Sequence, residues 1–512
     1  MERIAIIDLG SNSIRFLIKE INADSTFKLI FKDKKSIRLA EGMGKKLILT
    51  EAAIKKAVNC LKIYSNFIEF YNVDKIFAIA TAAVRNASNK KYFLERIKEE
   101  TGIKLNVIDG KKEAYLGFSG VIHTINKTDF LMFDLGGASI EISLIKNKKI
   151  INSISLPLGA VNLTEKFNLK KEISSKKIES LKKYIQNQIK SIEWLPKEEI
   201  PLIGIGGTVR SVAKIHQRQI NYPFKKLHNY TLPSSSISKI FEIIYSQASQ
   251  KRKNIPGLSE DRSDIILAGA IVINELLNSL SSKTLTISIS GLREGIFFNY
   301  YHSLNFHKKY NSDSMLINSV LNYKKMLIDN NVDYSNNITE IALLLFDKLK
   351  DIHKLTQNAR LLLRCASILH NIGLKVNYFK SEKHTAYIIL NASIYGWSHI
   401  DQIKTAFIAS FHNGFSNKII KNSSYITLLN NKEIREIKIL SFILHISEIL
   451  NFYKNISPKN IHISETEKNV ILHIGINKKD IHIIDYYTQS ILHYFCKLFS
   501  KKLLIKHYII NK

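Results

Sequence analysis

Two segments of the chain place an aspartate directly before a glycine turn, an arrangement that suits a phosphate or a metal ion. In Phe130–Ile142 (FLMFDLGGASIEI) an apolar run leads into Asp134, Gly136 and Gly137 follow, and apolar and polar residues then alternate, which predicts a strand, a tight turn and a second strand. Glycines have no Cβ, so backbone N–H groups can converge there on an anion. Asp134 and Glu141 flank the turn with the hard oxygen atoms that Mg²⁺ prefers. The pattern is also typical of an ordinary hairpin.

The start of the chain repeats this pattern in Ile4–Ile18 (IAIIDLGSNSIRFLI). Aligning the two segments pairs Asp8 with Asp134, Gly10 with Gly136, Ser13 with Ser139 and Arg15 with Glu141. Two such units predict two related halves that face each other across a cleft. Because one turn carries an arginine where the other carries a glutamate, one side is suited to a phosphate and the other to a metal ion.

Arg85 and Glu113 are further candidates for chemistry. Arg85 follows a predicted buried strand, Lys75–Ala80, and the carboxyl end of such a strand is where α/β folds place ligand contacts. Its guanidinium matches phosphate oxygens, although a surface ion pair is the alternative. Glu113 follows the predicted strand Lys104–Ile108 and falls in the first turn of a helix, where the helix dipole favours the ionised carboxylate. Such a carboxylate can take a proton from water, but first-turn glutamates are also common on solvated helices.

Two later segments add glycine turns. Gly206, Gly207 and Thr208 lie between the predicted strand Pro201–Ile205 and a helix, which is a phosphate-binding arrangement. Pro256–Asp264 (PGLSEDRSD) is predicted to begin another helix. Its Arg262 could reach an anion or pair with a neighbouring aspartate, and the sequence leaves both open.

Together these motifs resemble the exopolyphosphatase / guanosine pentaphosphate phosphohydrolase (Ppx/GppA) family. The resemblance rests on Asp8–Ser13 with Arg15, on Asp134–Gly137 with Ser139 and Glu141, and on matching segments at Thr81–Arg85, Gly110–Ala114, Pro256–Asp264 and Gly291–Gly295. It covers about residues 4–300 and extends more weakly to about 415. Two departures stand out: Lys112 replaces the first glutamate of the Gly-x-Glu-Glu-Ala segment, and Ala138 replaces a third glycine, which is tolerable where the backbone has negative φ.

The resemblance implies a fold and a set of site residues. The fold is α/β, with duplicated actin/sugar-kinase/Hsp70-like (ribonuclease H-like) subdomains, an all-α degenerate HD-like domain and a small α+β tail. Glu113 would be the catalytic base. The metal ligands for Mg²⁺ would be Asp8, Asp134 and Glu141. The phosphate-binding residues would be Gly10, Ser11, Asn12, Ser13, Arg15, Arg85, Gly136, Gly137, Ala138, Ser139, Gly206, Gly207 and Thr208.

The implied activity is Mg²⁺-dependent release of terminal orthophosphate from inorganic polyphosphate. Hydrolysis of guanosine pentaphosphate (pppGpp) with the same residues is the alternative, and an ATP-driven kinase has little support. A third hypothesis is a non-catalytic regulator that binds nucleic acid, an alarmone or another polyanion, because 75 Lys and Arg against 44 Asp and Glu give a net charge of +31. The lysines are spread along the chain, however, as an AT-rich genome would encode, so we expect no nucleic-acid partner.

We expect four domains, at residues 1–125, 126–304, 305–458 and 459–512. Leu369–Gly373 resembles the metal-binding helix of HD phosphohydrolases, but Asn371 replaces the aspartate ligand, so we expect no metal there and interpret His384 and His412 as core or surface residues. Some family members use such a domain to dimerise, which implies a homodimer. The basic end is either a polyanion track or a solvated face, with Lys497, Lys501, Lys502 and Lys506.

Periodicity predicts the elements around these sites. The expected strands are Phe27–Phe31, 461–464 and 470–474. A basic loop with Lys32, Lys34 and Lys35 is expected after the first of them. The expected helices are one capped by Thr50 and those at 90–101, 178–195, 337–355, 359–372 and from 487. The three cysteines lie far apart, no apolar run approaches the roughly 18 residues of a membrane helix, and the N-terminus shows no signal-peptide pattern. We therefore expect a cytoplasmic protein without a membrane partner.

Overall fold

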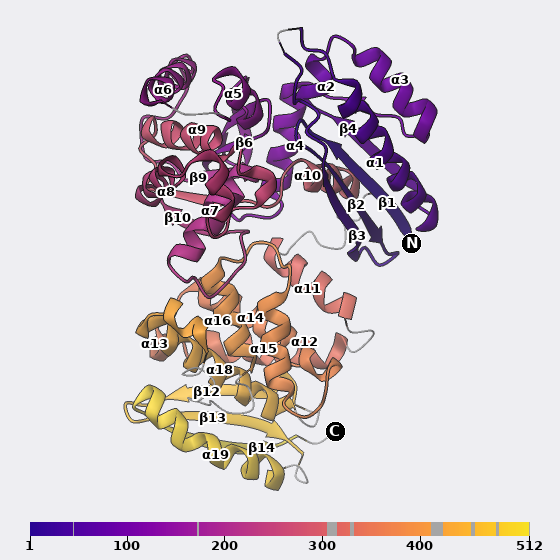
Figure 1. The fold of residues 1–512 in the computed structure, drawn as a ribbon. Coiled ribbons are helices and arrows are strands. Elements are labelled where there is room, and N and C mark those ends of the chain that lie inside the picture. The colour runs from indigo at the N-terminus through magenta and orange to yellow at the C-terminus, as the bar shows by residue number, and fades with distance from the viewer. Residues whose placement is uncertain are drawn as a thin grey trace. The chain divides into compact units, whose positions relative to one another are not determined.

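The computed structural model describes residues 1–44, 46–170, 174–304, 315–327, 332–410, 423–451, 456–477 and 481–510 (Figure 1). The chain divides into two compact units, Met1–Ser312 and Asp313–Lys512, which are described separately. The predicted catalytic, phosphate-binding and metal-binding residues all lie in the first unit.

The first sheet of this unit has five strands in the order β3-β2-β1-β4-β5, with the buried strand β1 at its centre. Its members are β1 (Glu2–Leu9), β2 (Ser13–Ile21), β3 (Phe27–Ser36), β4 (Lys75–Ala80) and β5 (Asn106–Val107). Strand β1 pairs with β2 antiparallel and with β4 parallel, which explains why six consecutive residues of β1 are buried. The predicted basic loop is wrong: Lys32, Lys34 and Lys35 belong to β3, where pairing with β2 outweighs their polarity.

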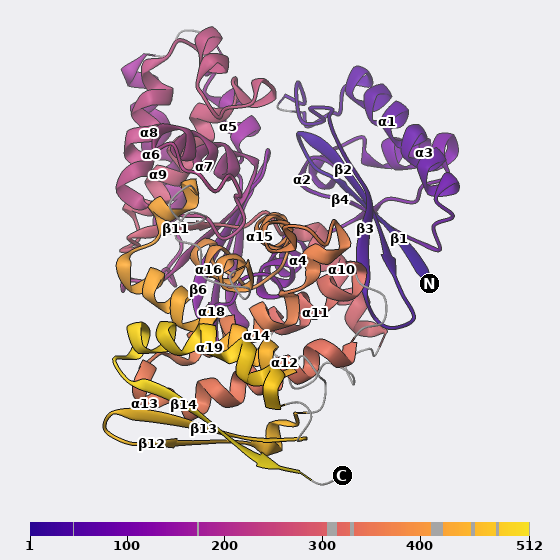
Figure 2. The same cartoon turned by 90° about the horizontal axis from the view of Figure 1, so that it is seen from below.

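Two amphipathic helices pack on this sheet, α1 (Glu51–Phe70) and α3 (Lys90–Thr101) (Figure 2). The α1 helix begins where predicted, because the Thr50 side chain accepts a hydrogen bond from the N–H of Ala53. The short helix α2 (Ala82–Asn86) follows β4 directly and carries Arg85.

The second sheet repeats the topology of the first. Its order is β10-β11-β9-β6-β7-β8, so β8-β7-β6-β9 corresponds to β3-β2-β1-β4. The strands are β6 (Phe130–Leu135), β7 (Ile140–Lys146), β8 (Lys149–Leu156), β9 (Leu202–Gly206), β10 (Thr231–Pro233) and β11 (Thr284–Ile287). The aspartates occupy the same register, because Asp8 lies opposite Arg15 and Asp134 lies opposite Glu141. The predicted duplication is confirmed strand by strand.

Helices of the second half differ from the predictions at their ends. They are α5 (Ala160–Lys166), α6 (Ser175–Lys190), α7 (Gly207–Gln219), α8 (Ser234–Ser246) and α9 (Ile266–Asn278). The helix expected to reach Leu195 ends at Lys190, shortly before Pro196, which the helix could not accommodate. The helix expected from Pro256 begins only at Ile266, because Gly257 adopts a φ of 95° and short 3₁₀ turns precede α9.

Helices α4 (Gly110–Ile122) and α10 (Leu292–Ser303) pack tightly against each other between the two sheets. A Cβ on Gly120 would lie 2.1 Å from the carbonyl oxygen of Gly291, and one on Gly295 would lie 1.9 Å from that of Leu116. Only glycine permits this approach, which fixes α4, the helix that carries Glu113, relative to the loop before α10.

The second unit is helical and ends in a small sheet. Its helices are α11 (Met315–Leu327), α12 (Val332–Lys348), α13 (Lys350–His353), α14 (Gln357–Leu369), α15 (Ser381–Asn391), α16 (His399–Ser410), α18 (Asn431–Asn451) and α19 (Ile481–Phe499). The sheet has the order β12-β13-β14, with β12 (Ile461–Glu465), β13 (Asn469–Ile476) and β14 (Lys502–Ile509). The helix expected over 337–355 is interrupted at Leu349, and β14 was not predicted, so Lys502 and Lys506 belong to a strand.

His370 is fully buried in this unit and donates from Nδ1 to the carbonyl of Ser367 (2.7 Å), whereas His384 is half-buried. His412 lies outside the described residues. Among the described helices, none is both long and apolar enough to cross a membrane.

Candidate active site

The two aspartate-bearing turns have the same backbone hydrogen bond and lie against each other. The N–H of Gly10 donates to the carbonyl of Ser13 (3.1 Å), and the N–H of Gly136 donates to that of Ser139 (2.9 Å). A Cβ on Gly137 would lie 3.1 Å from the Cβ of Ser11, so a larger residue at position 137 would push the turns apart. The duplicated halves therefore meet at their duplicated turns.

Hydrogen bonds from neighbouring segments orient the peptide groups of these turns. The carbonyls of Ser11 and Asn12 accept from the N–H groups of residues 37, 38 and 40, and the carbonyls of residues 136–138 accept from the N–H groups of residues 159–162. In a trans peptide the next N–H points the opposite way, so these N–H groups are directed away from the segments that hold the turns. They belong to Asn12, Ser13, Gly137, Ala138 and Ser139. Ala138 has no positive φ, which explains why alanine is tolerated there.

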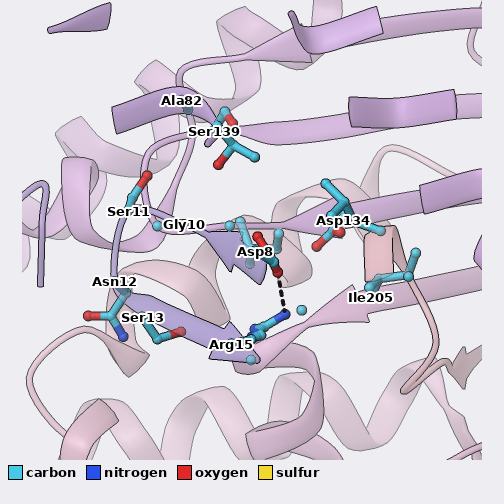
Figure 3. A pocket seen from close by; sticks show the side chains of 18 of the residues that line it. Asp8, Gly10, Ser11, Asn12, Ser13, Arg15, Ala82, Asp134, Ser139 and Ile205 are labelled. Carbon is cyan, nitrogen blue, oxygen red and sulfur yellow. Dashed lines mark ion pairs between the residues drawn. The ribbon is translucent and has the colours of Figure 1, made fainter. Parts of the chain in front are cut away.

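One cavity of the first unit, here called the central cavity, is lined by both turns (Figure 3). Its lining brings together nearly all the predicted residues, which are Asp8, Gly10, Ser11, Asn12, Ser13, Arg15, Glu113, Asp134, Gly136, Gly137, Ala138, Ser139, Glu141, Gly206 and Gly207. Two predicted residues are not in this lining. Thr208 is buried against Gly269, and Arg85 reaches the cavity only through its ion pair with Glu113.

Glu113 projects from the first turn of α4, which Asp109 caps by accepting the N–H of Lys112 (2.7 Å). The Arg85 guanidinium donates to Oε2 of Glu113 and to the carbonyl of Ile108, both at 2.9 Å, so it fixes the carboxylate in place. Burial raises the pKa of Glu113 well above its usual value, and the nearby Glu141 adds to this rise while Arg85 opposes it. A half-buried, oriented carboxylate with a raised pKa is suited to accept a proton.

The other acids of the cavity are also shifted. Burial raises the pKa of Asp134 to about 6, against the opposing charge of Arg15, and burial raises that of Glu141 to about 7. Oε1 of Glu141 accepts hydrogen bonds from the hydroxyls of Ser139 and Ser155, both at 2.7 Å. Asp8 pairs with Arg15 at 3.7 Å (Figure 3). The described residues contain no group of three or more His, Cys, Asp and Glu side chains arranged to hold a metal ion, and the three predicted ligands stay a prediction.

Four arginines also line the central cavity, and a role was predicted from the sequence for only one of them, Arg15. They are Arg15, Arg210, Arg262 and Arg293. All four also line an adjoining cavity, here called the basic cavity, with Lys32, Lys34 and Lys214. Burial, with Arg15 nearby, lowers the pKa of Arg210 to about 9 and that of Arg262 to about 10. The signal in the sequence was the position of these arginines: Arg210 follows the predicted phosphate-binding turn Gly206-Gly207, and Arg293 lies in the family-like segment Gly291–Gly295.

The contacts of the two aspartates beside Arg262 favour the anion-binding alternative for this arginine. Both aspartates beside it pair with cations of the first half instead: Asp261 accepts from Lys34 (2.9 Å), and Asp264 accepts two hydrogen bonds from Arg38 (2.7 and 3.3 Å). The Arg262 guanidinium faces Gly207, where a Cβ would lie 1.9 Å from its Cζ. Two ion pairs across the cleft thus hold the segment that presents Arg262 to both cavities.

Comparison with known proteins identifies the family. Residues 17–304 match the Ppx/GppA phosphatase family, and residues 318–482 match domain III of Ppx/GppA phosphatases. The chain belongs to the Ppx/GppA phosphatase family. It is thus a phosphatase of this family, and its two mixed sheets have the actin-like fold.

Relatives share the family fold over different lengths. A guanosine-5'-triphosphate,3'-diphosphate pyrophosphatase from Pseudoalteromonas translucida is 28% identical over 80% of both chains. A bifunctional 3-dehydroquinate synthase/phosphatase from Fusobacterium nucleatum is 34% identical over 56% of this chain, which spans 44% of that protein's own length. Among solved structures, the Aquifex aeolicus Ppx/GppA family member has a TM-score of 0.51 at 28% identity, over 59% of this chain and 99% of that one. An exopolyphosphatase from Cytophaga hutchinsonii has a TM-score of 0.54 at 26% identity, over 59% and 98%.

Proposed function

We propose that this Ppx/GppA phosphatase is an exopolyphosphatase that removes terminal orthophosphate from inorganic polyphosphate. The observation that carries the proposal is the position of Glu113, which is half-buried, fixed by Arg85 and lines the same cavity as both glycine turns and the arginines. Few other reactions need a proton acceptor, an anion-binding turn and several cations in one cavity.

The terminal phosphoryl group would bind between the two turns, with the N–H groups of Asn12, Gly137, Ala138 and Ser139 directed at its oxygens. Each charge-assisted hydrogen bond of this kind contributes about 1.5–3 kcal/mol. Glu113 would orient a water molecule and take its proton as the water oxygen forms a bond to phosphorus. The bond from phosphorus to the bridging oxygen would break at the same time, and the shortened chain would keep that electron pair. The arginines would neutralise the charge on the leaving chain.

The carboxylates suit the Mg²⁺ that we expect. Mg²⁺ is commonly held by one or two carboxylates together with substrate phosphates and water, so Asp134 and Glu141, with Asp8 beside them, supply an adequate donor set without a three-carboxylate cage. The raised pKa values of Asp134 and Glu141 reflect desolvation that the nearby arginines, Arg15 and Arg210 for Asp134 and Arg85 for Glu141, offset only in part. When bound, the ion would offset negative charge on the phosphate oxygens.

Hydrolysis of pppGpp to the tetraphosphate is the second candidate, because the Pseudoalteromonas relative carries that activity in its name and matches 80% of this chain. The basic cavity favours polyphosphate: its described lining combines seven cations with one acid, Asp261, and contains no aromatic side chain on which a guanine could stack. A long polyphosphate chain, which carries charge along its whole length, can interact with all of these cations.

The test is an orthophosphate-release assay on the full chain with MgCl₂ and equal concentrations of long-chain polyphosphate and pppGpp. We expect release from both, with the higher kcat/KM for polyphosphate. A higher kcat/KM for pppGpp would select the second candidate. Release from neither, combined with steeply salt-dependent binding to nucleic acid, would select the non-catalytic regulator. The homodimer and the cytoplasmic location stay predictions, and light scattering of the purified protein would test the first.

A further inference from the structure

The central cavity has two ends, and a different cavity adjoins each. The basic cavity shares the four arginines with it. A second cavity, here called the exit cavity, instead shares Ala82, Ala138 and Ser139 with it. In Figure 3, Ala82 and Ser139 lie at one end of the central cavity, Arg15 lies at the other, and Asp8 lies between them.

The exit cavity differs from the basic cavity in charge. It is lined by both halves of the first unit, by Met43, Leu47 and Asn86 on one side and by Pro157, Asn162 and Lys166 on the other. Its described lining contains two cations, Arg85 and Lys166, and one acid, Glu165, whereas the basic cavity has seven cations and one acid. A polyphosphate chain is therefore held far more strongly at the basic end.

The catalytic base is adjacent to the exit cavity. Arg85 lines this cavity and donates to Glu113, and Ser155 lines it and donates to Glu141. In phosphoryl transfer the attacking and leaving oxygens lie roughly in line on opposite sides of phosphorus. If the leaving chain occupies the basic cavity, the attacking water must approach from the opposite side, which is the side of Glu113 and the exit cavity.

We propose that the exit cavity admits the attacking water and releases orthophosphate. This inference rests on the proposed function and adds the route by which the reactant and the product pass. After hydrolysis, orthophosphate lies between the leaving chain and the exit cavity, so it leaves without crossing the arginines that bind the chain. Arg85 and Lys166 carry enough charge to accept the anion and too little to retain it.

The test narrows the exit cavity with exposed residues that have no part in the chemistry. Asn86 lies at the end of α2, and Asn162 lies in α5, where its side chain donates to the carbonyl of Pro157 (3.3 Å). Asn86→Trp and Asn162→Trp are made separately, one in each half, and thermal melts confirm that each folds. Lys214→Gln, in the basic cavity, is the matched control.

Two signals are followed with polyphosphate: bond cleavage by acid quench and free orthophosphate by a fluorescent phosphate-binding sensor. We expect each tryptophan variant to lower kcat by roughly three- to ten-fold, to lower KM in the same proportion so that kcat/KM is unchanged, and to lengthen the delay between cleavage and release, because release becomes limiting. Lys214→Gln should raise KM and leave the delay unchanged. Tryptophan variants that raise KM without lengthening the delay, or that change neither, would overturn the proposal.

A second readout does not need turnover. The exchange of inorganic orthophosphate with the protein, measured by ³¹P NMR line broadening, should slow in both tryptophan variants and keep its rate in Lys214→Gln. A wild-type protein that hydrolyses neither substrate but shows this pattern would refute the proposed function and leave the route standing. Exchange at the wild-type rate in both tryptophan variants would refute the route.

Discussion

Glu113→Gln separates a catalytic from a structural role for this residue. Glutamine keeps the size of the side chain and can still accept the hydrogen bond that Arg85 now donates at 2.9 Å, but it cannot take a proton from water. Loss of a general base typically costs 10²–10⁴-fold in rate, which corresponds to about 3–5 kcal/mol of activation free energy. We therefore expect kcat for orthophosphate release to fall by about that factor, while polyphosphate binding, measured by calorimetry, persists.

The same substitution should change the stability of the folded protein only slightly. The Arg85 and Glu113 side chains are 22% and 15% exposed, so removing one partner outright would approach the roughly 3–5 kcal/mol of a broken buried pair. Glutamine leaves a hydrogen-bonded, uncharged partner, and the desolvation of the carboxylate disappears, so we expect the free energy of unfolding in urea to change by no more than about 1 kcal/mol.

Glu51 provides the matched control. It is also a first-turn glutamate paired with an arginine, Arg96, but it lies on α1 and does not line the central cavity. Glu51→Gln should leave kcat within about two-fold of wild type, because its pair is largely exposed and contributes little. Wild-type turnover in Glu113→Gln, or a loss of stability in that variant without a loss of rate, would refute the assignment of the base.

Two other charged sites yield predictions. Arg38→Ala and Asp264→Ala should each raise KM for polyphosphate with little change in kcat, because this ion pair holds the segment that presents Arg262. The double variant should show a coupling free energy of about 1 kcal/mol between the two positions. Additive effects of the two substitutions on KM would contradict this. Burial lowers the pKa of Lys19 to about 8, from 10.5 in the unfolded chain, although the charge of Glu294 opposes the shift. Between these two pH values the unfolded state binds more protons than the folded state, so the free energy of unfolding should rise with pH over this range. Lys19→Met should raise the free energy of unfolding at pH 7 by about 1–3 kcal/mol, less than the full linkage because Nζ lies 3.6 Å from the Phe297 ring centroid, and should abolish the rise with pH. A destabilised methionine variant in pH-dependent urea titrations would show that the cation is needed for folding.

Elements whose signal is local were predictable from the sequence. Thr50 caps α1 and the strand Lys75–Ala80 has the predicted bounds, because capping and continuous burial depend on a few adjacent residues. The duplicated turns were also predictable, since the alignment pairs Asp8 with Asp134 and Arg15 with Glu141, and in each hairpin the two aligned positions are opposite each other across the strands.

Elements that depend on distant partners were not predictable. Strand β14 forms by pairing in parallel with the distant strand β13, and its own lysines, Lys502 and Lys506, are equally typical of a solvated tail. Lys32, Lys34 and Lys35 lie in β3 for the same reason. The boundaries of the domains as predicted stay predictions, because the two compact units divide the chain only at residue 312.

The sequence by itself determined which groups this protein has available for chemistry: two glycine turns of the same pattern, acids beside them and a glutamate at a helix start. It did so because each depends on residues close together in the chain. Only the tertiary structure decided which charges share a cavity. Arg210 and Arg293 join Arg15 and Arg262 in one lining, and Thr208 lies away from it. These outcomes depend on how two separately formed sheets pack through α4 and α10, and packing between distant segments leaves no local pattern in the sequence.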